Sequence, residues 1–474
     1  IEHQMNLMYE TLDIHQDNLP LKSSLNIYQK NALRIDWNEI LKPSNDVYIL
    51  GNPPFVGKQE QNNEQKDDMN IVFRGYDKIG TLDYVSAWYK KALDYIIGTE
   101  IECAFVSTNS ICQGEQPPIL WRILQENGII INFAHQSFKW SNEAKNNAGV
   151  NVVIIGFSMF ESNKKELFTY ETLNSSPKCN TVKNINCYLV DFDDVIIDKR
   201  NKPLCNVPPM VLGSIPRDGG NLILSSKEKE ELIQNEPLSK KYVKRLISTK
   251  EYLNNEKRYC LWLVDALPSD LKSMPTVLDR INKVKEFRLN STREQTRKLA
   301  AYPSKFAEIR QPKTDYILIP LTTSENREYL PIGFVDKNII ANNSASFIES
   351  DDKFLFGVIT SKMHMVWMEY VCGRLESRYR YSNTLVYNNF PFPHEVSEKE
   401  KNNVKKQVDN ILNIRNFYSE ETLADLYDPI LMPDDLKKAH HELDILIDKL
   451  YRKKPFLDNN ERMVFLLKEY LRLS

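Results

Sequence analysis

Short apolar runs and one longer periodic segment alternate along residues 46–160. Four runs have the length and the β-branched content of buried strands, at 47–50, 101–107, 129–133 and 150–157. Residues 81–97 instead repeat apolar side chains near the helical spacing, with Thr81 as a candidate cap. Strands that alternate with a helix are typical of an α/β sheet, and we predict one in this part of the chain.

A polar stretch with a proline cluster at 207–209 leads into a second region, where the apolar runs are shorter. Here we predict an α+β domain, with one apolar helix at 353–372 and strands at 259–264, 316–320 and 332–335. After residue 393 the chain is charged, poor in proline and periodic, which predicts a helical region. The predicted domains are residues 1–205, 206–393 and 394–474.

The composition is that of a globular protein with several domains. Of the 474 residues, 42% are hydrophobic and 27% charged, enough for two or three cores. No apolar run approaches the roughly eighteen residues that span a bilayer, and the first residues lack the features of a signal peptide. We therefore expect a cytoplasmic protein with no membrane contact. The seven cysteines stand singly, without zinc-ligand spacing, so we expect reduced thiols and no metal site.

Charge is balanced overall, at −2, but it is segregated locally. Residues 240–258 hold seven Lys/Arg against two Glu, and residues 286–313 hold seven against three, for local balances of +5 and +4. Such runs suit the phosphates of a nucleic acid. The solvated face of a surface helix explains either run equally well when it is taken alone.

The sharpest chemical signal is Asn52-Pro53-Pro54-Phe55, which follows the first predicted strand. Open α/β sheets bind ligands at the carboxyl ends of their strands. The Asn52 side-chain oxygen and the Pro53 carbonyl can accept hydrogen bonds from an exocyclic amino group, while the two proline rings fix the loop and remove donors. Phe55 offers a face on which a base turned out of a duplex can stack. The motif predicts methyl transfer to a planar amino group.

A phosphate-binding loop is the competing interpretation of the same stretch, from Gly51 to Gly57 and Lys58. Five residues rather than four separate the two glycines, and neither Ser nor Thr follows Lys58. The two prolines also remove amides that would hold a phosphate. We therefore reject this interpretation.

Three further side chains are candidates near this loop. Asp36, sixteen residues before Asn52, can accept from the adenine amino group of a nucleoside cofactor if it ends the preceding strand, although an acid at such a position is more often a helix cap. Phe138 and Trp140, in a predicted polar loop before the strand at 150–157, can sandwich a flipped base against Phe55. Ordinary hydrophobic packing is the alternative for both.

Residues 31–160 are similar to MmeI-like enzymes in the segments NALRIDW, ILGNPPFVG, LDYVSAWYKKA, CAFVSTNSI and VNVVIIGF. The similarity continues through GRLESRYRYSNTLVYNNFPFP at 373–393 and ADLYDPILMPDDLKKAHHELD at 424–444. The chain thus resembles type IIG restriction-modification enzymes whose methyltransferase is of the gamma, amino-group class.

This resemblance implies methyl transfer from S-adenosylmethionine to adenine N6 in double-stranded DNA. It implies a partial Rossmann-like methyltransferase sheet, then a target-recognition domain and a helical C-terminal region. Such enzymes hold the methionine end of the cofactor with a glycine-rich turn, and we find neither that turn before Asn52 nor a nuclease site. We therefore expect the carboxyl-terminal piece of a longer, monomeric enzyme, lacking N-terminal methyltransferase and nuclease portions and binding S-adenosylmethionine weakly when alone.

The resemblance also places base-reading residues at Asn343 and Ser344 and at the Glu-x-Arg position formed by Glu376 and Arg378. If residues 373–380 are extended, Glu376, Arg378 and Arg380 project from one face. A carboxylate can accept from cytosine and a guanidinium can donate to guanine, so Glu376 and Arg378 together suit one C·G pair. An intramolecular salt bridge is the alternative.

Three functions remain open at this point. The first is a sequence-specific DNA adenine methyltransferase within a restriction-modification enzyme. The second is a fragment that only binds DNA through its recognition domain. The third, methylation of RNA or of an amide in protein, uses the same loop but is less favoured by the basic stretches and the large second domain.

Overall fold

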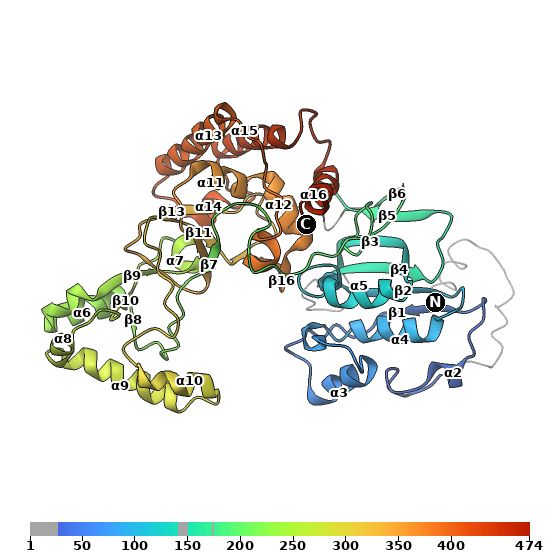
Figure 1. Ribbon diagram of the computed structural model, residues 1–474, viewed down its shortest axis with the longest axis horizontal. Helices are drawn as coiled ribbons and strands as arrows, with labels where there is room; N and C mark the ends of the chain where they lie inside the picture. Colours follow the sequence, from blue (N-terminus) through green and yellow to red (C-terminus); the bar gives the residue numbers. More distant parts are fainter. Residues whose placement is uncertain (1–26, 141–149, 173–174) are drawn as a thin grey trace, which may run out of the picture. The chain divides into compact units, whose positions relative to one another are not determined.

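The structure is a computed structural model that describes residues 27–140, 150–172 and 175–474. A six-stranded mixed sheet comes first, in the order β1-β2-β4-β3-β5-β6 (Figure 1). β1 and β2 are parallel, and β4 lies antiparallel between β2 and β3, so the carboxyl ends of β1, β2 and β3 share one edge. The strands are β1 (Tyr48–Gly51), β2 (Glu102–Thr108), β3 (Ile130–Trp140), β4 (Val150–Ser158), β5 (Lys165–Thr169) and β6 (Lys178–Val182).

Helices α4 (Ser86–Ile96) and α5 (Pro117–Glu126) cover one face of this sheet (Figure 1). The ring of Tyr89 on α4 lies 5.2 Å from that of Phe105 on β2 and 5.3 Å from that of Phe157 on β4. Trp121 on α5 contacts the same Tyr89 ring at 6.0 Å. These buried aromatic rings join the two helices to the middle of the sheet. A further helix, α3 (Asn63–Val72), precedes α4.

The two faces of β1 have different surroundings. The register places Ile49 and Gly51 beside two buried residues of β2, on the face that α4 covers. Tyr48 and Leu50 point to the other face, where they are 66% and 78% exposed. Within the described part of the chain, β1 is an edge strand whose one hydrogen-bonded neighbour is β2.

The start of the helix predicted at 81–97 is wrong. Ile79–Thr81 form a separate 3₁₀ turn, Leu82 is extended with ψ 142°, and α4 begins only at Ser86. Thr81 therefore does not cap α4, which has no side-chain cap. The interruption leaves Asp83 outside the helix, where its carboxylate contacts two loops.

The strand predicted at 129–133 is longer than expected and continues to Trp140. β4 pairs with it as far as Trp140, with Phe138 opposite Val152. Phe138 and Trp140 consequently lie in a strand and not in the predicted polar loop. The polar residues between Ala134 and Phe138 hid this strand, because two irregularities in the pairing break the alternation.

The second region contains two four-stranded sheets and one three-stranded sheet, in the orders β14-β9-β10-β8, β13-β11-β15-β7 and β12-β17-β16. The strands are β7 (Met210–Leu212), β8 (Ile223–Leu224), β9 (Val243–Ile247), β10 (Arg258–Leu261), β11 (Tyr316–Pro320), β12 (Thr322–Thr323), β13 (Gly333–Val335), β14 (Ile340–Ala341), β15 (Ala345–Ile348), β16 (Gly373–Leu375) and β17 (Arg378–Arg380). The helices are α6 (Ser226–Asn235), α7 (Thr249–Leu253), α8 (Pro268–Lys272), α9 (Pro275–Leu289), α10 (Glu294–Lys298), α11 (Lys353–Thr360) and α12 (Lys362–Val371).

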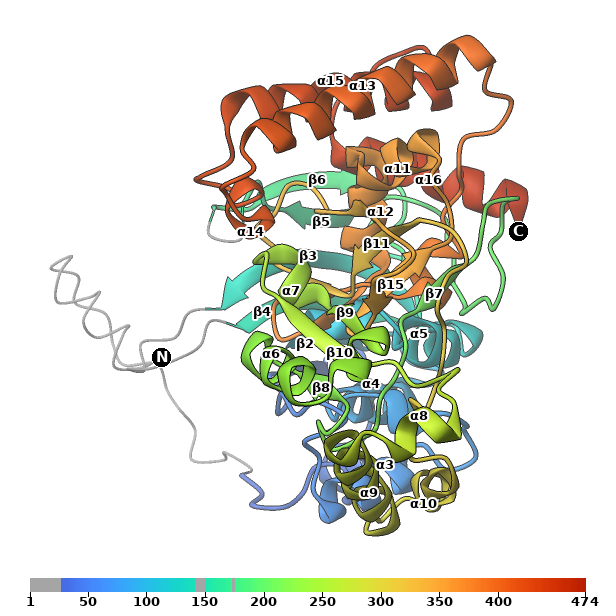
Figure 2. The same ribbon diagram turned by 90° about the vertical axis from the view of Figure 1, so that its left-hand side faces the viewer.

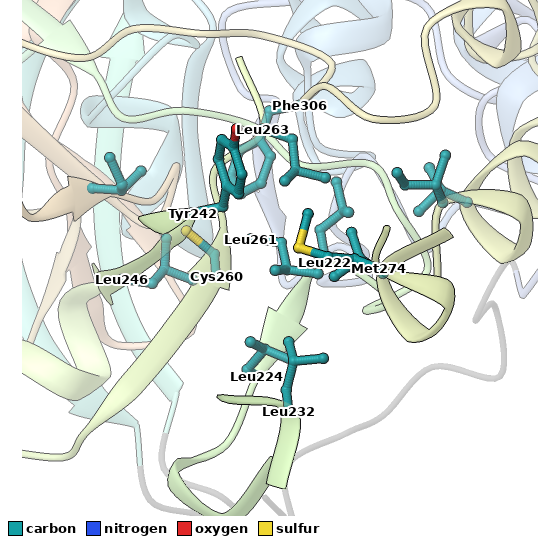
Figure 3. Close-up of a cluster of buried hydrophobic side chains, with 14 residues drawn as sticks. Leu222, Leu224, Leu232, Tyr242, Leu246, Cys260, Leu261, Leu263, Met274 and Phe306 are labelled. Atoms are coloured by element: carbon teal, nitrogen blue, oxygen red, sulfur yellow. The ribbon is translucent and has the colours of Figure 1, made fainter. Parts of the chain in front are cut away.

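A compact apolar core joins the first of these sheets to α6 and α9, and Figure 3 shows its side chains. Leu246 on β9, Leu261 on β10 and Leu232 of α6 all belong to this core. Val277 and Ile281 of α9 complete the core, four residues apart on one face of their helix. The α9 helix is thereby held against the sheet.

The single helix predicted at 353–372 is in fact two helices, α11 and α12, which are separated at Ser361. Ser361 is extended, with ψ 161°, and the amide of Lys362 donates to the Asp444 carboxylate at 2.7 Å. That hydrogen bond replaces one that a continuous helix would form. Asp444 comes from the helical tail, so the break depends on a distant segment.

The tail after residue 393 is helical, as predicted. Its two long helices, α13 and α15, lie side by side (Figure 2). The helices are α13 (Glu398–Phe417), α14 (Leu423–Leu426), α15 (Asp434–Tyr451) and α16 (Asn459–Leu473). The predicted fold class is confirmed, with an α/β sheet followed by an α+β region and a helical region.

Two general findings complete the fold. No helix in the described ranges is both long and apolar enough to cross a membrane. All seven cysteines are free thiols, five of them buried, which agrees with a packing role.

Candidate active site and recognition groove

Asn52 follows directly on the carboxyl end of β1, and its side chain is exposed. Pro53 is buried and Phe55 is half-buried, so one side of the loop is anchored while the amide faces outward. Gly51 has no Cβ, and a Cβ built there would lie 3.0 Å from the Phe105 ring. The aromatic ring of β2 therefore lies against the strand end that carries Asn52.

Asp83 holds the loop that follows Asn52. Its carboxylate accepts from the amide of Lys58 at 2.9 Å and from the hydroxyl of Ser110 at 2.5 Å. Beside it, the amide of Tyr84 donates to the carbonyl of Val56 at 2.9 Å. A carboxylate that receives donors from two loops restricts both. Sequence reasoning missed Asp83, because it stood at the beginning of a segment predicted to be one helix.

Phe138 and Trp140 belong to an aromatic cluster at the carboxyl end of β3. Phe138 stacks on Tyr170 with centroids 5.1 Å apart, and Trp140 lies 6.2 Å from Phe138. The Tyr170 hydroxyl also shares a 2.8 Å hydrogen bond with Nδ1 of His135. Among the described residues, no ring contact joins Phe55 to Phe138 or Trp140. One face of Phe138 is thus covered by Tyr170, and the sandwich with Phe55 stays a prediction.

Asp36 does not end a strand, which corrects the position predicted for it. Its carboxylate caps α2 (Trp37–Ile40) and accepts from the Asn38 amide at 2.9 Å. Residues 27–42 belong to a different compact unit from residues 43–474. Among the described residues, those that suit S-adenosylmethionine lie only where its methyl group would be transferred, beside the exposed Asn52. Residues 1–26 lie outside the described part of the chain.

Two of the predicted base-reading residues, Ser344 and Arg378, line one groove of about 480 Å³. Three cationic side chains, Lys250, Arg327 and Arg378, lie in its wall together with Ser and Thr residues. Two contacts tie Thr249 to Ser344, one of them from its amide to the Ser344 hydroxyl at 3.3 Å. The loop 342–344 is therefore positioned by α7.

The predicted extended face of Glu376, Arg378 and Arg380 is only partly correct. Arg378 and Arg380 do share one exposed face of β17. Glu376 lies in the turn before that strand, with φ +58°, so its direction does not follow the alternation. Asn343, Glu376 and Arg380 are not among the residues that line the groove.

The two basic runs are less available than their charge indicates. Arg288 is fully buried and donates to backbone carbonyls. Lys241 pairs at 3.0 Å with Asp270, an acid that lies outside both runs. The nominal balances of +5 and +4 therefore overstate the charge that these runs present to a phosphate backbone.

A sheet that presents Asn-Pro-Pro-Phe at the carboxyl end of a strand, followed by a domain whose groove holds three cationic side chains, is the arrangement of a methyltransferase with an attached recognition domain. Three sequence families match consecutive parts of the chain: "MmeI, DNA-methyltransferase domain" over residues 1–169, "MmeI, target recognition domain" over residues 191–394 and "MmeI, C-terminal domain" over residues 396–474. The chain belongs to the MmeI family of restriction-modification proteins.

Two relatives show how far this similarity extends. "DNA methyltransferase A" of Bacillus subtilis (strain 168) is 40% identical over the whole of this chain, which covers 54% of that protein. The solved structure of the type IIL restriction-modification enzyme MmeI in complex with DNA is 46% identical, with a TM-score of 0.86, over the whole of this chain and 63% of the MmeI chain. The chain thus spans 54% of the length of the first relative and 63% of the second.

Proposed function

We propose that this protein transfers a methyl group from S-adenosylmethionine to N6 of adenine in double-stranded DNA, at a site read by its second domain. The observation that carries the proposal is the exposed side chain of Asn52 at the carboxyl end of β1, within a chain of MmeI-type domains. The relatives support DNA as the substrate, since one is named a DNA methyltransferase and the other was solved with DNA.

The chemistry assigned to the loop is orientation of the amino group. Two acceptors, the Asn52 amide oxygen and the Pro53 carbonyl, take the two N–H bonds of the exocyclic amine. Its lone pair then turns out of the plane of the base and toward the donor. The nitrogen would form a bond to the methyl carbon as the sulfonium sulfur leaves as a neutral thioether, and the proton released from the amine would pass to solvent. S-adenosylmethionine supplies the methyl group when it is bound.

Phe55, Phe138 and Trp140 are assigned to the flipped base. The base would have to leave the duplex to reach Asn52, and stacking on aromatic faces offsets part of the cost of unstacking. Phe138 is held by Tyr170 on one face, which leaves Phe55 and the partly exposed Trp140 as the more accessible surfaces. Asp36 stays a weaker candidate for the cofactor, because its carboxylate already caps a helix.

Recognition is assigned to the groove that Ser344 and Arg378 line, with Asn343, Glu376 and Arg380 beside it. Hydrogen-bonding side chains that face a groove can read base edges, whereas the lysines outside it contact phosphates without regard to sequence. Arg378 is the sharpest candidate, since a guanidinium can donate twice to guanine.

The test is methyl transfer by the protein as encoded by its gene, with labelled S-adenosylmethionine and a DNA of mixed sequence, followed by nucleoside analysis. We expect labelled N6-methyladenine in one sequence context. Labelled N4-methylcytosine would overturn the adenine assignment. DNA binding without any transfer would favour the alternative, a recognition module that only binds.

A further inference from the structure

The loop between β2 and α5 touches the hairpin that β16 and β17 form, called the recognition hairpin below, at a point where two glycines meet. A Cβ built on Gly114 would lie 2.8 Å from the Cα of Gly373, the first residue of β16. The Gly114 amide donates to the carbonyl of Val371 at 3.1 Å. Backbones approach this closely only where a side chain is missing.

Gln113, the preceding residue, makes the polar part of the same contact. Its side-chain oxygen accepts from Nε of Arg374 at 3.0 Å, and its amide donates to the carbonyl of Glu369 at 3.1 Å. Beside it lies a cavity of about 210 Å³, which Gln113, Arg374 and Tyr379 help to line. The loop therefore contacts the hairpin through the backbone at Gly114 and through a side-chain hydrogen bond at Gln113.

The same loop, residues 109–116, also contacts the segment 52–58, which begins with Asn52 and is called the Asn52 segment below. Ser110 donates to Asp83, which in turn accepts from the amide of Lys58. Glu115 lies 3.8 Å from the ammonium of Lys58. Arg380, on β17, is close enough to contribute to the field on Glu115, whose pKa is held below its usual value by Lys199, Lys58 and Arg380 against the opposing effect of burial. Loop 109–116 therefore contacts both the candidate catalytic segment and the recognition hairpin.

We infer that loop 109–116 transmits the position of the recognition hairpin to the Asn52 segment, with Gly114 as a positioning residue. The inference rests on the proposed function and adds to it a link between reading and transfer. When the hairpin binds its cognate bases, its position fixes Gly114 and Gln113. The same loop then fixes Lys58 through the contacts of Asp83 and Glu115. Methyl transfer then depends on the hairpin being correctly placed as well as on DNA being bound.

The glycines of the chain offer matched variants. Gly114→Ala puts a methyl group 2.8 Å from Gly373, at a residue with φ +71°. Gly98→Ala imposes the same kind of backbone strain, at φ +75°, but has nothing within 4 Å. Gly373→Ala puts its Cβ 3.6 Å from Gly114, an ordinary contact. Comparing these variants separates the effect of the steric contact between loop and hairpin from the effect of backbone strain at a positive φ.

The experiment measures the methylation rate at saturating DNA, the Kd for cognate DNA and the thermal midpoint for the wild type and the three variants. We expect Gly114→Ala to lower the saturated rate by about 10- to 100-fold, the loss that small misplacements of reacting groups produce. Its Kd should stay within about threefold of that of Gly98→Ala. Gly98→Ala should keep the saturated rate within about threefold of the wild type, and Gly373→Ala should lose less of the rate than Gly114→Ala.

Three outcomes overturn the inference. Equal losses in Gly114→Ala and Gly98→Ala would mean that only backbone strain matters. A weaker Kd with an unchanged saturated rate would mean that Gly114 serves DNA binding alone. No methylation by the wild type would overturn the proposed function, and the inference with it.

Gln113→Ala keeps the inference testable if Gly114→Ala does not fold. It removes both side-chain hydrogen bonds to the hairpin side and introduces no steric clash. A lower saturated rate with an unchanged Kd supports the inference, and an unchanged rate overturns it.

Discussion

The guanidinium of Arg378 donates to the carboxylate of Glu376 at 2.7 Å, across the turn between β16 and β17. Both side chains are open to solvent, at 47% and 76% exposure. An ion pair in water contributes only about 0–1 kcal/mol, so little opposes its exchange for contacts to bases. The intramolecular salt bridge is therefore present, and it is compatible with base reading.

Exchanging the two charges tests base reading. Glu376→Lys with Arg378→Asp should move the preference at one position from C to G, since Lys can donate to guanine and Asp can accept from cytosine. Each good contact discriminates by about 1–3 kcal/mol, which a survey of methylated sites would reveal. An unfolded domain, or lower activity at an unchanged site, would show that the pair is structural.

Asn52→Ala should abolish methyl transfer while leaving DNA affinity nearly unchanged. The side chain aligns the amino group and contributes little to phosphate contact. Asn63→Ala, at an exposed asparagine that opens α3, is the matched control and should methylate normally. Rates and Kd values for one cognate duplex suffice, and an Asn52→Ala rate within about tenfold of the wild type, a difference of only about 1.4 kcal/mol, would contradict the role.

Arg288→Met should strongly destabilise the second region. Its buried guanidinium donates to the carbonyls of Arg217, Pro216, Leu299, Tyr302 and Lys305, and no neutral apolar side chain can serve them. We expect a loss of about 3–5 kcal/mol in the free energy of unfolding. Lys285→Met, at an exposed position of the same helix, should change it by less than about 0.5 kcal/mol in a urea titration. Equal midpoints for the two variants would refute this role.

His364 should make the protein sensitive to acid. Burial lowers the pKa of this imidazole to about 3, below the ordinary value of 6.5, so the folded state keeps it neutral where the unfolded chain binds a proton. The neutral His364 side chain contributes fully to the free energy of unfolding above pH 6.5, and this contribution is lost as the pH falls toward 3.

His364→Gln, which cannot titrate, should flatten this dependence. Between pH 7 and pH 5 the wild type should lose about 2 kcal/mol more than the variant, at about 1.4 kcal/mol per pH unit below 6.5. The Tyr381 hydroxyl, 2.8 Å from Nε2, retains a polar partner in the variant. Parallel pH profiles from denaturant titration would show that His364 does not contribute.

The open face of β1 predicts a solubility effect. Tyr48→Lys with Leu50→Lys should raise the soluble fraction of the 474-residue chain when it is expressed. Exposed apolar residues on an edge strand promote association. Ile49→Lys should lower it, since Ile49 lies on the face that α4 covers. Light scattering and the soluble yield distinguish the two, and a double variant that aggregates more than the wild type would refute the prediction.

Local patterns predicted the elements whose partners lie nearby. The strand predicted at 316–320 coincides with β11, because five consecutive buried residues have few other conformations that pair every amide. The loop at Asn52 also lies at the predicted strand end. Its motif is local, and the strand before it is short and apolar.

Features that depend on distant partners could not be predicted in this way. The break at Ser361 has no proline or glycine, and it follows from Asp444 binding the amide of Lys362 from the tail. Asp83 likewise acquires its role from Lys58 and Ser110, more than twenty residues away on either side. Glu376 left the extended face for a left-handed turn, a conformation that glycine and asparagine usually adopt.

The meeting of Gly114 with Gly373 bears on how such proteins can acquire new specificities. Recombination with a relative that exchanged the whole segment 191–394 would replace the residues around Gly373. Gln113 and Gly114, on the other side of the contact, would stay unchanged. Any hairpin whose backbone ran slightly closer would collide with the loop. Changes of single side chains in the groove, such as Ser344 or Arg378, leave that contact untouched. With Ser344 and Arg378 as the proposed base-reading residues, point substitutions in the groove are a smoother route to a new target than exchange of complete recognition domains.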